Sequence, residues 1–150
     1  MFRLNRLTDY AVVVMAQMAL RDKATLTATE LSRDTGVPLP TVAKVLNALA
    51  RDGLIVSQRG AAGGYGLSRP ASEIGVAEII QAIEGPIALT ACVEGSAAQC
   101  EVEGLCPMRG GWDRVNQAIR TALEQVTLAD MAGPALSFDD GPAPGDRLHA

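Results

Sequence analysis

Apolar residues recur with a helical period through the first third of the chain. Residues 9–21 contain the run YAVVVMAQMAL, which is apolar almost all round and predicts a buried helix capped by Thr8. A second, short helix is predicted to begin at Thr27, because Thr27 and Glu30 have the spacing of a capping box. This helix should end at Gly36, a residue type that favours helix termini.

A third helix is predicted from Pro40 to Asp52, with Gly53 at its C-terminal cap. One face is apolar at helical spacing: Val42, Val45, Leu46 and Leu49. The other face is small, polar and basic: Thr41, Ala43, Lys44, Asn47, Ala48 and Arg51. Two short helices joined by a Gly-Val-Pro-Leu turn are typical of a helix-turn-helix, whose second helix enters a major groove. Taken alone, this face is explained equally well as an ordinary solvated surface.

A β-hairpin is predicted directly after the third helix. Residues 54–58 and 65–68 read as its strands, and the basic, glycine-rich segment between them forms a flexible tip. Such a hairpin is typical of the wing of a winged helix, and it would place Arg59 near a minor groove. A phosphate-binding glycine loop is disfavoured, because the segment lacks the Lys-Ser/Thr ending. The predicted DNA contacts are Thr41, Lys44, Asn47, Arg51, Arg59 and Gly60.

The second half of the chain adds two more amphipathic helices. Residues 75–85 form a helix with one apolar face, which Gly85 and Pro86 end. Residues 112–126 form a long helix whose apolar stripe has the spacing of a coiled-coil seam: Trp112, Val115, Ile119, Ala122 and Val126. Because no later long element covers this stripe, it packs on its own domain or on a second copy. We expect the second copy, and therefore a homodimer.

These elements predict a mostly α fold with a small β-hairpin, a winged helix-turn-helix followed by a long C-terminal dimerisation helix. The expected boundaries are a DNA-binding domain at 1–85, a cysteine-rich cluster-binding loop at 86–110, the dimerisation helix at 111–132 and a disordered tail at 133–150.

Charge separates the two halves of the 150-residue chain, although its net charge is only −4. Residues 1–70 carry 9 Lys and Arg against 5 Asp and Glu, whereas residues 71–150 carry 4 against 12. A basic N-terminal half suits an anionic polymer such as double-stranded DNA.

The N-terminus lacks the apolar core of a signal peptide, and no apolar run is long enough to span a membrane, so we expect a cytoplasmic protein without membrane contact.

All three cysteines, Cys92, Cys100 and Cys106, lie in one short segment without core-forming residues. Their odd number and the expected reducing compartment argue against a disulfide framework. Zinc is disfavoured, because no Cys-x-x-Cys pair is present and the only histidine, His149, lies in the tail. An iron–sulfur cluster, 2Fe–2S or 4Fe–4S, is the preferred interpretation. Another metal, a thiol switch or three unrelated thiols remain alternatives.

In this order, the motifs resemble the Rrf2 family of bacterial transcription regulators over residues 2–132. The residues that carry the resemblance are Arg3-Leu4, Thr8-Asp9-Tyr10-Ala11, Arg59-Gly60, Gly63-Gly64-Tyr65, Val76, Ile79, Ile80, the three cysteines and Trp112. The similarity is strongest to regulators of the SUF iron–sulfur assembly operon. The resemblance implies a homodimer, in which the long helix is the interface and the cluster loop lies near the partner's DNA-binding domain.

The chain departs from the family pattern at two functional positions. Arg109 stands where the IscR type has a histidine ligand, and Ala43 replaces that type's recognition-helix glutamate. Similarity to the NsrR type implies Asp9 as a fourth cluster ligand, reaching across the dimer. An acid in the first turn of a helix is also favoured by the helix dipole alone, so both explanations of Asp9 stay open.

The preferred function is a cluster-dependent regulator, a repressor of iron–sulfur assembly genes. The alternatives are a regulator of the same family that senses nitric oxide or redox state, and an electron-transfer protein that does not bind DNA. An enzyme is not expected, because the cysteines have no catalytic His/Asp partner outside the tail.

Overall fold

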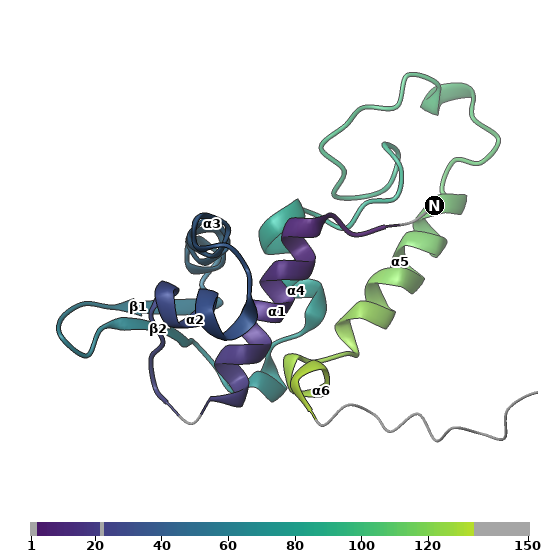
Figure 1. The fold of residues 1–150 in the computed structure, drawn as a ribbon. Coiled ribbons are helices and arrows are strands. Elements are labelled where there is room, and N and C mark those ends of the chain that lie inside the picture. Colours follow the sequence, from purple (N-terminus) through teal and green to yellow (C-terminus); the bar gives the residue numbers. More distant parts are fainter. Residues whose placement is uncertain (1–2, 22, 134–150) are drawn as a thin grey trace, which may run out of the picture.

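The computed structural model describes residues 3–21 and 23–133, so most of the tail predicted to be disordered, including His149, lies outside the described residues. The elements are α1 (Arg6–Leu20), α2 (Ala28–Thr35), α3 (Leu39–Arg51), β1 (Ile55–Gln58), β2 (Gly64–Leu67), α4 (Val76–Glu84), α5 (Gly111–Glu124) and α6 (Leu128–Ala132), with single 3₁₀ turns at Ala71–Glu73 and Glu103–Leu105. The fold is mostly helical with one antiparallel two-stranded sheet, as predicted. Figure 1 shows the hairpin and the cysteine loop at opposite sides of the molecule.

The first helix begins earlier than predicted. Its cap is Asn5, whose side-chain oxygen accepts a hydrogen bond of 2.9 Å from the backbone N–H of Thr8. The prediction that Thr8 is the cap is therefore wrong. Thr8 is instead buried inside the helix, where its hydroxyl donates to the Glu84 carboxylate at the end of α4. Asn and Thr are both good caps, and the Glu84 carboxylate accepts hydrogen bonds from both the Asn5 N–H and the Thr8 hydroxyl.

The helix-turn-helix is built as its sequence predicts. Thr27 and Glu30 form the capping box of α2, and Gly36 ends that helix with φ of 77°. Pro40 lies in the first turn of α3, one residue later than predicted, and Gly53 follows the helix with φ of 76°. A positive φ favours glycine, because a Cβ would be strained there.

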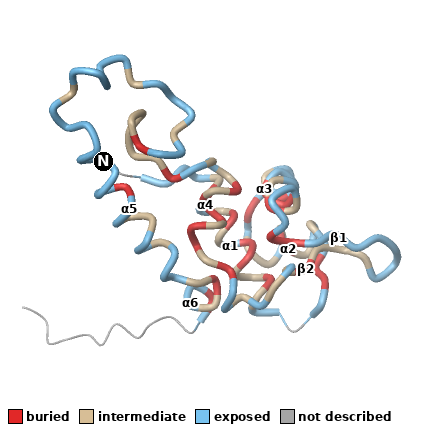
Figure 2. Tube along the Cα trace, turned by 180° about the vertical axis from the view of Figure 1, so that it is seen from behind, coloured by how far each residue is buried: buried red, intermediate tan, exposed pale blue. Residues whose placement is uncertain are grey.

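The core surrounds α1, which packs against α2, α3, α4, α6 and β2. Its buried residues lie on one side, whereas Val13 and Leu20 are 38% and 63% exposed, so the helix is not buried all round as expected. Figure 2 shows the buried residues gathered where α1, α3 and α4 meet.

The chain returns to this core after α5. Leu128 of α6 is fully buried in the main cluster, and its backbone N–H donates to the carbonyl of Ile74 over 2.8 Å. The backbone N–H of Val76 donates to the carbonyl of Val126 over 2.9 Å. Residues 126–132 therefore pack on the core formed by the earlier helices instead of extending α5. We call residues 3–85 and 126–132 the body, and residues 86–125 the arm.

Within the ranges 3–21 and 23–133, no helix has the length and apolar character needed to cross a membrane.

Candidate functional site

The face of α3 that was predicted to meet DNA is free of intrachain packing. Val42, Val45, Leu46 and Leu49 are all fully buried on the opposite face. Lys44, Asn47 and Arg51 are exposed and Thr41 is half-buried. The core thus sets the rotation of α3 about its axis, and it turns this polar, basic strip outward.

The turn between α2 and α3 is held by side chains. The hydroxyl of Ser32 donates to the carbonyl of Val37 over 2.7 Å, and that of Thr35 donates to the carbonyl of Leu31 over 2.7 Å. Val37 is buried at the centre of the turn. The Ser32 bond ties the turn to α2, whereas the Thr35 bond lies within the last turn of α2.

The wing is anchored at its base by the link between α1 and α2. Leu26 and Tyr65 exchange two backbone hydrogen bonds of 2.9 and 2.8 Å, and the hydroxyl of Thr25 donates to the carbonyl of Ala62 over 3.1 Å. Cβ atoms added at Gly64 and Gly66 would lie 2.7 and 2.6 Å from backbone oxygens of this link. The glycines that suggested a flexible tip are therefore partly required by close backbone packing.

The tip itself points away from the body and is exposed. Arg59 and Gly60, which follow β1, are both exposed, as the DNA-binding interpretation requires. Gly60 has φ of 108°, a conformation that a residue with a Cβ rarely adopts.

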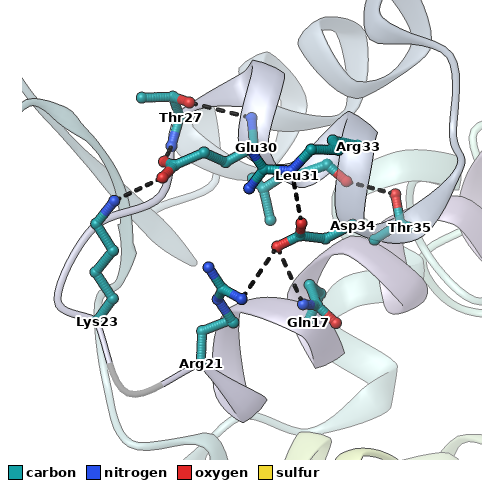
Figure 3. A network of polar contacts seen from close by, with 9 residues as sticks. All are labelled: Gln17, Arg21, Lys23, Thr27, Glu30, Leu31, Arg33, Asp34 and Thr35. Carbon is teal, nitrogen blue, oxygen red and sulfur yellow. Dashed lines mark hydrogen bonds and ion pairs between the residues drawn. The ribbon is translucent and has the colours of Figure 1, made fainter.

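A polar network at the junction of α1 and α2 neutralises several cations of the basic half (Figure 3). Asp34 lies 3.2 Å from Arg33 and 3.7 Å from Arg21, and Lys23 lies 2.6 Å from Glu30. The hydrogen bond from Lys23, followed by the one from the backbone N–H of Thr27, lowers the pKa of Glu30 to about 2. Glu30 therefore stays ionised and holds its lysine in place.

The predicted DNA face carries exposed cations that take part in none of these ion pairs. Arg69 is also paired, with Glu78 at 2.6 Å. By contrast, no ion pair in the described part of the chain involves Lys44, Arg51 or Arg59. Cations without an acidic partner are the ones that can neutralise phosphates.

The cysteine segment has two parts that differ in packing. The root, residues 87–94, contains Cys92 and buries Ile87 and Val93, which are 8% and 4% exposed. The arch, residues 95–110, contains Cys100 and Cys106 and exposes Leu105 almost completely, at 96%. All three thiols are free and half-buried.

The predicted cluster ligands are not assembled within one chain. Among the residues that the structure describes, no three His, Cys, Asp or Glu side chains are grouped so that they could hold a metal ion. No such group contains Cys92, Cys100, Cys106 or Asp9. Asp9 is exposed in the first turn of α1. Three thiolates are the donors that an iron–sulfur cluster takes, so the donor chemistry fits the cluster whereas the single-chain arrangement does not.

The apolar stripe of α5 is exposed, with two corrections. Trp112 and Val115 are each 44% exposed and Ala122 is also exposed. Ile119 is half-buried, and Leu123, one turn later, packs against the apolar cluster of α4. Val126 lies beyond the end of the helix at Glu124 and belongs to the return toward the body. The stripe therefore covers mainly the first three turns of α5.

Sequence reasoning missed Asn116, the only buried residue of α5. Its side-chain oxygen accepts from the backbone N–H of Leu89 over 2.9 Å, and its amide donates to the carbonyl of Ile87 over 3.0 Å. The available signal was an uncharged polar residue between two apolar positions of an amphipathic helix.

A helix-turn-helix with an anchored wing and unpaired cations on both defines a winged-helix DNA-binding protein. Comparison with known proteins leads to the same class. The family model Rrf2, described as an iron-dependent transcriptional regulator, matches residues 4–134. Rv1287 of Mycobacterium tuberculosis, provisionally named an HTH-type transcriptional regulator, is 33% identical over 136 residues, which are 89% of this chain and 83% of the relative.

Two solved structures extend the likeness to the whole fold. CymR of B. subtilis, titled the global cysteine regulator, superposes with a TM-score of 0.68 at 25% identity and covers 88% of this chain and 97% of its own. IscR of T. potens superposes with a TM-score of 0.66 at 25% identity, and the match covers 87% of this chain and 85% of that structure's chain. The chain belongs to the Rrf2 family of transcriptional regulators. It is thus a DNA-binding regulator and not an enzyme.

Proposed function

We propose that this chain acts as a homodimer that places α3 of each subunit in a major groove and each wing in the neighbouring minor groove. The observation that carries the proposal is the distribution of unpaired charge. In the described ranges, Lys44, Arg51 and Arg59 lack acidic partners, whereas the cations at the α1–α2 junction have them. The exposed stripe of α5 supplies an apolar surface for the second subunit.

We further propose that the regulator is controlled by an iron–sulfur cluster held by Cys92, Cys100 and Cys106, with Asp9 of a second subunit as the fourth ligand. The family's description as iron-dependent and the likeness to an IscR support this proposal. A bound cluster would supply sensitivity to iron, oxidants or nitric oxide. The target genes on this proposal are those of cluster assembly, which the protein represses.

DNA binding is tested by selecting bound duplexes from a random pool and titrating the selected site at several salt concentrations. Lys44→Ala should reduce the salt slope by about one unit if it contacts one phosphate, and Arg59→Ala should weaken sites with A·T-rich flanks most. Arg114→Ala, which removes one charge from α5, is the matched control and should leave the slope unchanged. Unchanged affinity in both Lys44→Ala and Arg59→Ala would refute this assignment of the DNA face.

Cluster binding is tested on protein purified without oxygen. Each of Cys92→Ser, Cys100→Ser and Cys106→Ser should remove the visible absorption band and most of the iron and sulfide, while the far-UV spectrum stays that of a folded helical protein. Asp9→Ala should change the band without abolishing it. Full iron content in every single cysteine variant would exclude the cluster assignment.

A thiol switch is the second candidate, because all three thiols are free and half-buried. Because the three free thiols are not gathered on a metal site in the described chain, two of them are open to oxidation by a peroxide, which would form one disulfide and release two waters. Mass analysis after peroxide treatment separates the two candidates. The thiol switch is supported if the protein holds no cluster, forms a reversible internal disulfide and then no longer binds its DNA site.

A further inference from the structure

One buried side chain of α5, Asn116, attaches the cysteine segment to this helix. Asn116 is 5% exposed, although it lies on a helix that otherwise presents half-buried and exposed residues. Both ends of its amide are paired, at 2.9 Å with the N–H of Leu89 and at 3.0 Å with the carbonyl of Ile87. A buried amide that makes two bonds to the same short segment specifies the position of that segment.

The held segment leads directly to the first cysteine. Ile87 is packed in the apolar cluster between α4 and α5, and Val93 is buried on the far side of Cys92. The thiol of Cys92 lies 3.2 Å from the hydroxyl of Thr90, and the N–H of Glu94 donates to the Asp113 carboxylate of α5 over 3.3 Å. Cys92 is therefore bracketed by two attachments to α5.

The backbone hydrogen bonds of the other two cysteines are made within the arch. The carbonyl of Cys100 accepts from the N–H of Glu103 over 3.4 Å, and the carbonyl of Cys106 accepts from the N–H of Arg109 over 3.2 Å. Both bonds close local turns in a segment whose side chains are mostly exposed. Local turns of this kind open easily, whereas the root is tied to a helix.

We propose that Asn116 is a positioning residue for Cys92: it ties the root of the cysteine segment to α5, so that chemistry at Cys92 displaces the helix and not the loop alone. On this proposal the Cys92 thiol stays in place, and movement of the arch brings Cys100 and Cys106 toward it. This inference rests on the proposed sensing by the cysteine segment, but the position of Cys92 can be measured without DNA or iron.

The experiment measures the alkylation rate of each cysteine in the reduced, metal-free, full-length protein by mass spectrometry. Asn116→Leu keeps the volume and loses both hydrogen bonds, and Gln117→Leu makes the same change on the exposed side of α5. We expect the rate at Cys92 to rise about tenfold in Asn116→Leu, since the thiol reacts from an opened root, with Cys100 and Cys106 changing less than about twofold. Asn116→Asp, which keeps the acceptor for Leu89, should give a smaller rise, and Gln117→Leu none.

Two outcomes would overturn the proposal. An unchanged Cys92 rate in Asn116→Leu would mean that the amide does not hold this thiol, and an equal rise at all three cysteines would mean that Asn116 only stabilises the arm as a whole. If Asn116→Leu does not fold, the graded comparison of wild type with Asn116→Asp decides between the same outcomes.

A second measurement follows the displacement to DNA. In protein whose only cysteine is Cys92, alkylation should change affinity for the selected DNA site by at least about threefold, and Asn116→Leu should remove most of that change. Equal responses with and without Asn116 would overturn the proposal. A protein that binds no DNA in any state would instead refute the proposed function, while the alkylation rates would still decide the role of Asn116.

Discussion

The body and the arm use their apolar residues in opposite ways. The largest fully buried side chains, among them Met15, Leu31, Leu46 and Leu128, all belong to the body. In the arm, only Ile87, Val93 and Asn116 are buried, whereas Val102, Leu105, Met108, Trp112 and Val115 are between 44% and 96% exposed. Exposed apolar side chains gathered on one segment mark a surface for a partner. The body thus contains the main core, whereas the arm buries few residues and exposes most of its large apolar side chains.

This difference explains why the two sites are defined to different degrees. The DNA face is carried by α3 and the wing, whose orientation follows from core packing within the subunit. The cysteine site is carried by a segment that packs on α4 of the body through Ile87 and is hydrogen-bonded to α5 of the arm. Its ligand geometry therefore depends on what covers the arm, which a second subunit would supply.

The sharpest test of this comparison is a charge placed on the stripe of α5. Val115→Glu should convert a dimer to a monomer, because an unpaired charge buried in an interface costs about 3–5 kcal/mol. That cost raises the dimer dissociation constant by a factor of about 100 to 1,000 or more. Sedimentation velocity measures the result, with Gln117→Glu as the control off the stripe. A wild-type monomer at micromolar concentration would contradict the proposed interface, as would a Val115→Glu dimer.

Truncating one leucine in each region compares their packing directly. Leu31→Ala should lower the free energy of unfolding by about 2–5 kcal/mol, because Leu31 is fully buried in the core of the body. Leu105→Ala should change it by less than about 0.5 kcal/mol, because that side chain is 96% exposed. Urea unfolding of both variants gives the two values. A large loss for Leu105→Ala would show that the arch is packed in solution.

Adding one methyl group to a glycine in each region gives a smaller contrast. Gly66→Ala places a Cβ 2.6 Å from the carbonyl oxygen of Ala24, so the wing must shift, at a cost of about 1–3 kcal/mol. Gly104→Ala meets nothing within 4 Å. Thermal unfolding and operator titration should show losses only for Gly66→Ala. Wild-type operator affinity in Gly66→Ala would mean that the anchored wing position is not needed for binding.

The smallest expected effect is a pH dependence confined to the body. The pKa of Glu30 is lowered from 4.5 to about 2, so its ionised form stabilises the fold above pH 4.5 and that stabilisation is lost as pH falls toward 2. The stability difference between wild type and Glu30→Gln should therefore shrink over this interval. Thermal unfolding of both proteins at a series of pH values measures it, and a difference independent of pH would contradict the role of the Lys23 contact.

Much of the body could be predicted from local sequence. The capping box of Thr27 and Glu30, the buried face of α3 and the two strands of the wing all depend on residues within a few positions of one another. Their physical causes, which are helix capping, period and turn chemistry, act over the same short range. The same holds for the choice of three clustered cysteines as the candidate sensing segment.

The tertiary structure decided what depends on distant partners. Thr8 is a buried donor and not a cap because Glu84 lies beside it, and Gly66 is required because the backbone of Ala24 passes close to it. Asn116 is buried because α5 lies beside residues 87 and 89. Local interactions specify the helices, the strands of the wing and the residues available for chemistry, so these follow from the sequence alone. The pairing of the cations at the α1–α2 junction, and the hydrogen bonds of Asn116 to residues 87 and 89, depend on segments far apart in the chain, because only folding brings their charges and amides within bonding distance.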